Sequence, residues 1–283
     1  MTANGTSWLV VGVVLVAALC HAGWNAIAKW APDSQQAMAL INGSGTVVAG
    51  VLVFFVPLPA TAAWPYLVAS AALHLVYSAV LGLAYRLGDF SQIYPLARGL
   101  SPLLVAGAAP LVAAEHLDGV QLVALGLICG GLGGVVFAGG RPSKAGVPGV
   151  VAAVMTGVLI ASYTVVDGLG VRASGTAAGY TAWLVLLFGP VLPLLLWRRA
   201  MRVRPSIRVV VPCLLAGVVA LAGYGLVLWA QTRASLALVA ALRETSVVFA
   251  AMIGAVAFGE SFGRARTASA VVIAGGIALL NLA

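Results

Sequence analysis

Apolar stretches of about 20 residues with very few charges fill almost the whole chain, and they limit its possible folds more than any other feature. The first of them runs from Ser7 to Trp30. Because backbone groups in lipid must be hydrogen-bonded internally, only helices and closed barrels can cross a membrane. Barrel strands alternate polar and apolar residues, whereas these stretches are continuous. The sequence therefore predicts an all-α membrane protein.

Composition excludes an ordinary soluble domain. Hydrophobic residues make up 62% of the chain and charged residues only 8%, whereas a soluble domain carries about 25% charged residues. A net charge of +8 would favour nucleic acid as a partner of a soluble protein, but here the basic residues lie mostly between the spans, where they set membrane orientation. We expect membrane lipid and a small-molecule substrate as partners, no nucleic acid, and a monomer or homodimer.

The three cysteines lie inside apolar stretches and show no metal-ligand spacing, so we expect neither metal nor cofactor. Ten spans are predicted, and most of the connections between them are short. Their ranges are 7–30, 36–56, 64–86, 91–113, 119–139, 148–170, 177–197, 209–232, 235–257 and 265–282.

An internal repeat divides these spans into two sets of five. An offset of 145 residues, the difference between 98 and 243, pairs Arg98 with Arg243 and Glu115 with Glu260. Overall identity is low, but an arginine within a span and a glutamate in a loop are rare here. Because five is odd, the second set enters the membrane upside down, as in many transporters. The expected repeats cover residues 1–140 and 145–283.

Basic residues in the loops indicate orientation in the cell (inner or plasma) membrane. The loops on one side carry eleven lysines and arginines, whereas those on the other carry only Arg172 and Arg233. The positive-inside rule then places both termini outside.

Polar residues within the spans are the candidate substrate-binding residues, because such residues are costly in lipid. In the first span His21, Asn25 and Lys29 share one helix face, with Trp24 beside them. One interpretation is that this face lines a substrate pathway. The other is that Asn25 and Lys29 lie at the level of the lipid headgroups, next to a belt of aromatic residues. The third span carries His74 and Tyr77. Both histidines are packing residues or parts of a titratable relay.

The fourth span places Tyr94 and Arg98 on one face. Arg98 keeps its proton and needs an acceptor or water. Either Glu244, next to Arg243, or Asp167 could serve both arginines. Asp167, which follows Tyr163 by one turn, could also be a loop carboxylate or the partner of Arg172.

Two further features have architectural interpretations. Glu115 and Glu260 end their spans, where we expect each to cap the helix that follows. Gly126, Gly130 and Gly134 form a ridge that permits close helix packing, within the chain or in a dimer.

The chain resembles the EamA-type transporters of the drug/metabolite transporter superfamily over nearly its full length. The resemblance rests on ten spans in two halves and on the motifs Tyr94-Pro95-Leu96-Ala97-Arg98-Gly99, Pro102, Glu115, Glu260, His21-Ala22-Gly23-Trp24-Asn25 and Tyr163-Thr164-Val165-Val166-Asp167-Gly168. It implies a central cavity lined by the first to fourth and sixth to ninth spans, with the fifth and tenth peripheral. The second half has Ala240 where the first has Pro95, which argues against a symmetric role for that proline.

Members of that family export amino acids, other metabolites or drugs, and the resemblance therefore implies a non-enzymatic secondary transporter or facilitator. We expect export of small polar metabolites, amino acids or organic acids, by alternating access. A drug exporter and an uptake permease are the alternatives. A membrane-embedded enzyme is more remote, because the chain shows no metal motif or nucleophile constellation.

Overall fold

The computed structural model describes residues 7–87, 90–115, 117–137, 147–200, 205–258 and 264–280, and the secondary structure in these ranges is entirely helical. The helices are α1 (Trp8–Trp30), α2 (Ser34–Leu52), the 3-10 turn η1 (Thr61–Ala63), α3 (Trp64–Leu87), α4 (Phe90–Val112), α5 (Gly119–Phe137), α6 (Val147–Ser174), α7 (Ala177–Phe188), α8 (Val191–Ala200), α9 (Ile207–Gln231), α10 (Leu236–Arg243), α11 (Ser246–Phe258) and α12 (Arg264–Leu280).

Each of the ten predicted ranges contains helix, but two are broken. A turn at Gly189–Pro190 separates α7 from α8, and a turn at Glu244–Thr245 separates α10 from α11. Pro190 explains the first break, because it lacks a backbone N–H. Within the described residues, six helical stretches are long and apolar enough to cross a membrane, and two of them run through these breaks.

Side-chain caps fix several helix starts. Ser7, Asp33, Thr176 and Ser235 accept hydrogen bonds from backbone N–H groups in the first turns of α1, α2, α7 and α10. Such caps satisfy donors that have no partner within the helix. Gly175, with φ of 71°, makes the tight turn between α6 and α7.

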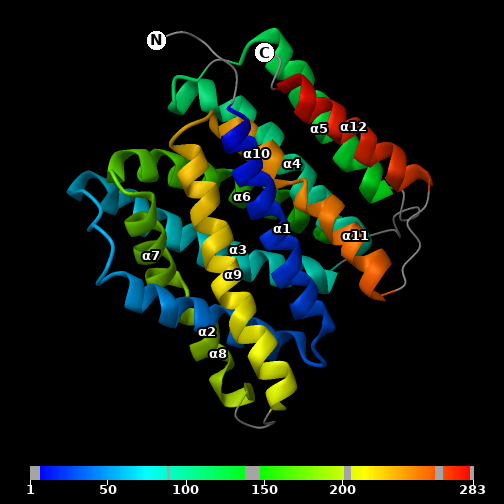
Figure 1. Cartoon of the computed structure of the whole chain (residues 1–283). Coiled ribbons are helices and arrows are strands. Elements are labelled where there is room, and N and C mark those ends of the chain that lie inside the picture. Colours follow the sequence, from blue (N-terminus) through cyan, green and yellow to red (C-terminus); the bar gives the residue numbers. More distant parts are fainter. Residues whose placement is uncertain are drawn as a thin grey trace.

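The helices pack as a bundle in which α6 and α9 take central places. α6 contacts α3 and α4, while α9 contacts α1 and α2. α5 and α12 run side by side along one edge (Figure 1). This arrangement brings α1, α3, α4, α6, α9 and α10 together in the middle of the bundle.

The polarity of the bundle is the reverse of a soluble protein. Large apolar side chains such as Leu111 and Val256 are 86% and 89% exposed, whereas Arg98, Asp167 and Glu244 are buried. An apolar exterior with interior charges fits lipid as the solvent. The described fold is therefore that of a multi-pass helical membrane protein.

The glycine face that packs in α5 differs from the predicted ridge. Gly134 faces α12, but Gly126 and Gly130 have open space where a Cβ would lie. Gly131 makes the close approach instead, since a Cβ there would lie 2.6 Å from Ile273 Cγ1. α5 is apolar on all sides, so its sequence pattern does not indicate which side meets the partner helix.

This contact predicts that two glycine-to-alanine substitutions in α5 differ in their effect on stability. Gly131→Ala should destabilise the fold by about 1–3 kcal/mol, the usual cost of overpacking. Gly126→Ala should leave stability unchanged or raise it by up to about 1 kcal/mol, because alanine is the better helix former. Thermal unfolding of both purified variants in detergent measures this difference. Equal melting temperatures would show that α5 does not meet α12 at Gly131.

Candidate functional site

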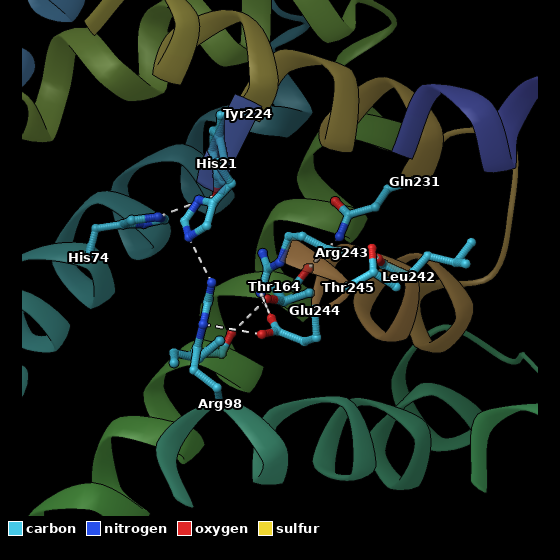
Figure 2. A network of polar contacts seen from close by, with 11 residues as sticks. His21, His74, Arg98, Thr164, Tyr224, Gln231, Leu242, Arg243, Glu244 and Thr245 are labelled. Atoms are coloured by element: carbon cyan, nitrogen blue, oxygen red, sulfur yellow. Dashed lines mark hydrogen bonds and ion pairs between the residues drawn. The ribbon is translucent and has the colours of Figure 1, made fainter. Parts of the chain in front are cut away.

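Two buried arginines from different halves of the chain share one carboxylate. Arg98 of α4 places Nε 3.1 Å from Glu244 Oε2, and Arg243 of α10 donates from Nη2 to Glu244 Oε1 at 3.3 Å. All three side chains are at least 90% buried. Figure 2 shows Arg98 approaching Arg243 and Glu244 from a different helix. Of the two acids predicted as possible partners, the structure selects Glu244 for both arginines.

His21 of α1 extends this arginine cluster, which comprises His21, Arg98, Arg243 and Glu244. Arg98 Nη2 lies 2.7 Å from His21 Nε2 (Figure 2). A guanidinium can only donate hydrogen bonds, so Nε2 must be the acceptor and the ring is neutral with its hydrogen on Nδ1. The cluster thus contains two cations and one anion, and its net charge is +1.

The break between α10 and α11 positions the charges of this cluster. Arg243 ends α10, and Glu244 lies in the turn before α11 begins at Ser246. A helix C-terminus stabilises a cation, and a helix N-terminus stabilises an anion. The backbone therefore favours the positive charge of Arg243 and the negative charge of Glu244 where each occurs.

Asp167 of α6 is the centre of a second buried cluster. Its Oδ1 accepts from the Tyr180 hydroxyl of α7 at 3.1 Å, and its Oδ2 accepts from the Tyr224 hydroxyl of α9. Tyr224 Oη also lies 3.3 Å from His74 Nε2 of α3. Of the alternatives predicted for Asp167, a loop carboxylate is wrong, since the residue is fully buried. A partner of Arg172 is also wrong, because Arg172 pairs with Glu115.

Aromatic rings surround His74. Tyr163 and Phe188 stack on its ring with centroids 4.2 and 4.6 Å away, and Tyr77 meets Tyr163 edge-on at 5.6 Å. The predicted candidates His74, Tyr77, Tyr163 and Asp167 therefore all belong to one region of the bundle. Such stacking restricts the orientation of the His74 ring.

The remaining predicted residues lie at different places. Trp24 packs edge-on against His21 at 5.1 Å, while Asn25 donates to the His21 carbonyl at 2.7 Å. Asn25 thus bonds to its own helix. Lys29 is exposed in the last turn of α1. Tyr94 belongs to α4, but its side chain lies outside the described residues.

Sequence reasoning did not select Tyr180 or Tyr224, the two tyrosines that donate to Asp167. The only available signal is that a buried tyrosine hydroxyl needs a partner. That signal does not identify the partner, because a tyrosine in an apolar stretch looks the same in either role.

Glu115 is architectural, as predicted, but it does not cap the helix that follows it. Its Oε2 accepts from the Leu236 N–H at the start of α10 at 2.7 Å, and its Oε1 accepts from Arg172 at 2.6 Å. Asp118 caps α5 instead, through the Gln121 N–H at 2.8 Å. Ala114, with φ of 51°, lies in the turn that precedes Glu115. The corresponding prediction for Glu260 falls outside the described residues.

Comparison with known proteins supports the helical-bundle fold described above. One protein with a solved crystal structure matches 97% of this chain and 96% of its own with a TM-score of 0.77 and 20% sequence identity. At that identity the match establishes the fold alone. No curated protein matches the sequence.

A helical bundle with an apolar exterior and buried charges defines a multi-pass membrane protein. Residues 147–282 match the model of the EamA-like transporter family. Over these residues the predicted resemblance to that family, which is part of the drug/metabolite transporter superfamily, is confirmed. Members of this family are transporters.

Arg172 links three elements at one end of the bundle, and its removal should therefore destabilise the fold. Besides Glu115, it donates to the Gln231 carbonyl at 2.8 Å and the Ala234 carbonyl at 2.9 Å. The side chain is 31% exposed, so we expect Arg172→Ala to cost about 1–2 kcal/mol rather than the full value of three charged hydrogen bonds.

Thermal unfolding in detergent tests this expectation, with Arg208→Ala as the control. Arg208 is an exposed arginine in the first turn of α9. Arg172→Lys should lose most of the same stability, because lysine lacks the planar fork of donors. If the Arg172→Ala and Arg208→Ala variants both melt at the wild-type temperature, Arg172 does not hold these elements together.

Proposed function

We propose that this protein is a secondary transporter that exports small polar metabolites bearing a carboxylate, such as amino acids or organic acids, by alternating access. The arginine cluster is the proposed binding site for that carboxylate. The observation that carries the proposal is the net positive charge buried among α1, α4 and α10. Since an uncompensated charge is costly in a low-dielectric interior, this site favours an anionic ligand.

The hydrogen-bonding capacity of the region supports the same class of ligand. Within the described residues, Arg243 Nε, Ser101 Oγ and Ser246 Oγ are buried and have no hydrogen-bond partner in the protein. All three can donate, which suits the oxygens of a carboxylate. Ser101 and Ser246 each follow an arginine of the cluster by three residues, one in each half.

A neighbouring acceptor and nearby rings suit the rest of an amino acid. Gln231 Oε1 is a buried acceptor without a partner among the described residues. An ammonium or hydroxyl group could donate to it. Trp24 beside His21, and Tyr163 beside His74, offer apolar faces. These features favour a compact ligand with one anionic end over a large cationic drug, which the net positive charge would repel.

The packing supports ten spans in two inverted repeats, and hence alternating access. In two equivalent halves, α1 corresponds to α6, α2 to α7, and α3 to α9. If the halves are exchanged, the α3–α6 contact becomes the α9–α1 contact and the α2–α9 contact becomes the α7–α3 contact. All four contacts exist. The α5–α12 contact exchanges with itself. The family match over residues 147–282 also falls within the proposed second repeat. Paired repeats of this kind can rock about a site at their interface.

Ligand-dependent thermal stability tests the proposed site. Purified protein is screened against amino acids and organic acids, each beside its carboxamide, which has the same shape without the charge. A binding carboxylate at about 100 times its Kd should stabilise the fold by about 2.7 kcal/mol. Its carboxamide should not. Arg98→Gln and Arg243→Gln should each abolish the shift, while Arg233→Gln, an exposed arginine beside Trp229, should retain it.

The compound that stabilises the protein is then tested for transport in liposomes. We expect wild-type protein and Arg233→Gln to catalyse counterflow, and Arg98→Gln and Arg243→Gln to lose it. Normal counterflow by both latter variants would rule out the arginine cluster as the binding site. Equal stabilisation by carboxylate and carboxamide would rule out recognition by charge.

A further inference from the structure

The Asp167 cluster is a second buried ionisable site, and the arginine cluster does not explain it. Asp167 is fully buried, yet no lysine or arginine among the described residues forms an ion pair with it. Its hydrogen-bond partners are the hydroxyls of Tyr180 and Tyr224 and the side chain of Ser70. A buried carboxylate without a cation is costly in a membrane. The position of His74 beyond Tyr224 shows how that cost can be avoided.

The surroundings of His74 determine where one of its hydrogens lies. Nδ1 is 2.9 Å from the Ser70 carbonyl oxygen, which can only accept. Nδ1 therefore carries a hydrogen, and the Ser70 hydroxyl, 3.2 Å away, acts as a further neighbour. The only titratable position left on the ring is Nε2, and it faces Tyr224 Oη at 3.3 Å. Figure 2 shows this contact between α3 and α9.

Counting hydrogens shows that the three groups need one extra proton. Tyr224 has a single hydroxyl hydrogen but two neighbours, Asp167 Oδ2 and His74 Nε2. If Tyr224 donates to Asp167, Nε2 must be protonated in order to donate to Tyr224. If Tyr224 donates to Nε2, Asp167 must be protonated in order to donate to Tyr224. Without the extra proton, one contact would place two lone pairs against each other.

The charge of the group favours the same occupancy. With one extra proton, the three side chains are neutral overall, either as imidazolium and carboxylate or as imidazole and carboxylic acid. Without it, their net charge is −1 in a low-dielectric interior, which is unfavourable. Both hydrogen-bonding and charge therefore favour a single bound proton.

We propose that His74, Tyr224 and Asp167 form a site for one proton, which passes between Asp167 and His74 through the Tyr224 hydroxyl and serves as the coupling ion of transport. In this transfer the O–H bond of the Asp167 acid breaks as a new O–H bond forms on Tyr224. The original Tyr224 hydrogen moves to His74 Nε2. Tyr224 is regenerated, and the products are a carboxylate and an imidazolium.

Other groups act on this site from each neighbouring helix. Tyr163 of α6 and Phe188 of α7 cover the two faces of the His74 ring, and Tyr180 of α7 donates to Asp167. Arg243 at the end of α10 is the permanent cation whose charge acts on both His74 and Tyr224. Arg243 also belongs to the proposed substrate site. A carboxylate that neutralises Arg243 and a proton bound at Asp167 would therefore favour each other. In export the two would leave together, driven by the outward gradient of the metabolite.

The existence of the proton site can be tested without a substrate. Purified protein in weak buffer is shifted from mildly acidic pH, where an exposed aspartate is already ionised, to alkaline pH, and an indicator dye counts the protons released. Asp167→Asn should release one proton fewer than wild type, because a proton on His74 alone would leave an uncompensated charge. Asp118→Asn, which neutralises an exposed capping carboxylate, should match wild type. Equal release by Asp167→Asn and wild type would overturn the proposal.

Two tyrosine variants test the relay itself. Tyr224→Phe and Tyr180→Phe each remove one hydroxyl that donates to Asp167, but only Tyr224 also contacts His74. In liposomes, Tyr224→Phe should keep counterflow at equal pH and lose accumulation driven by a pH gradient. Tyr180→Phe should keep both. Gradient-driven accumulation by Tyr224→Phe at the wild-type level would show that the hydroxyl is not a relay.

The role in coupling rests on the proposed transport function, and the two experiments separate the possible failures. If Tyr224→Phe does not fold, His74→Gln replaces it and should show the same loss of gradient-driven accumulation. If wild-type protein moves no carboxylate in counterflow, the proposed function fails. The proton count then still decides whether His74, Tyr224 and Asp167 bind a proton.

Discussion

Two permanent cations buried in a low-dielectric interior share a single carboxylate, and much of the central architecture depends on this constraint. Arg98 and Arg243 cannot easily lose their protons, so each needs a negative partner, and Glu244 serves both. To do so, Glu244 must lie where α4 and α10 approach, in the turn that separates α10 from α11. His21 completes the arrangement from α1 as a neutral acceptor.

The second ionisable cluster also contains a buried charge, but that charge is balanced in a different way. Asp167 has no arginine or lysine partner among the described residues, and its charge is balanced instead by a proton held with His74 and Tyr224. Arg243 connects the two clusters, since its charge acts on His74 as well as on Glu244. A site with an excess cation beside a site that holds a proton is the proposed physical basis for moving a carboxylate together with a proton.

The helices were predictable because lipid imposes their length: the expected 7–30 and the observed Trp8–Trp30 differ by one residue. The break at Glu244–Thr245 was not, because it contains neither glycine nor proline. Arg98, Arg243 and Glu244 were predictable as a group, since ionisable residues in apolar stretches have few possible partners. Tyr180 was not, because its partner Asp167 lies 13 residues away on another helix.

A mutant cycle in stability tests the shared carboxylate most directly. Thermal unfolding in detergent is measured for wild type, Glu244→Gln, the double variant Arg98→Met/Arg243→Met, and the triple variant. If Glu244 is the counter-charge of both arginines, Glu244→Gln should cost about 3–5 kcal/mol in the wild-type background, because two cations lose their partner. The same substitution should cost little or nothing, or stabilise the fold, when the arginines are absent. An equal loss in both backgrounds would contradict the account.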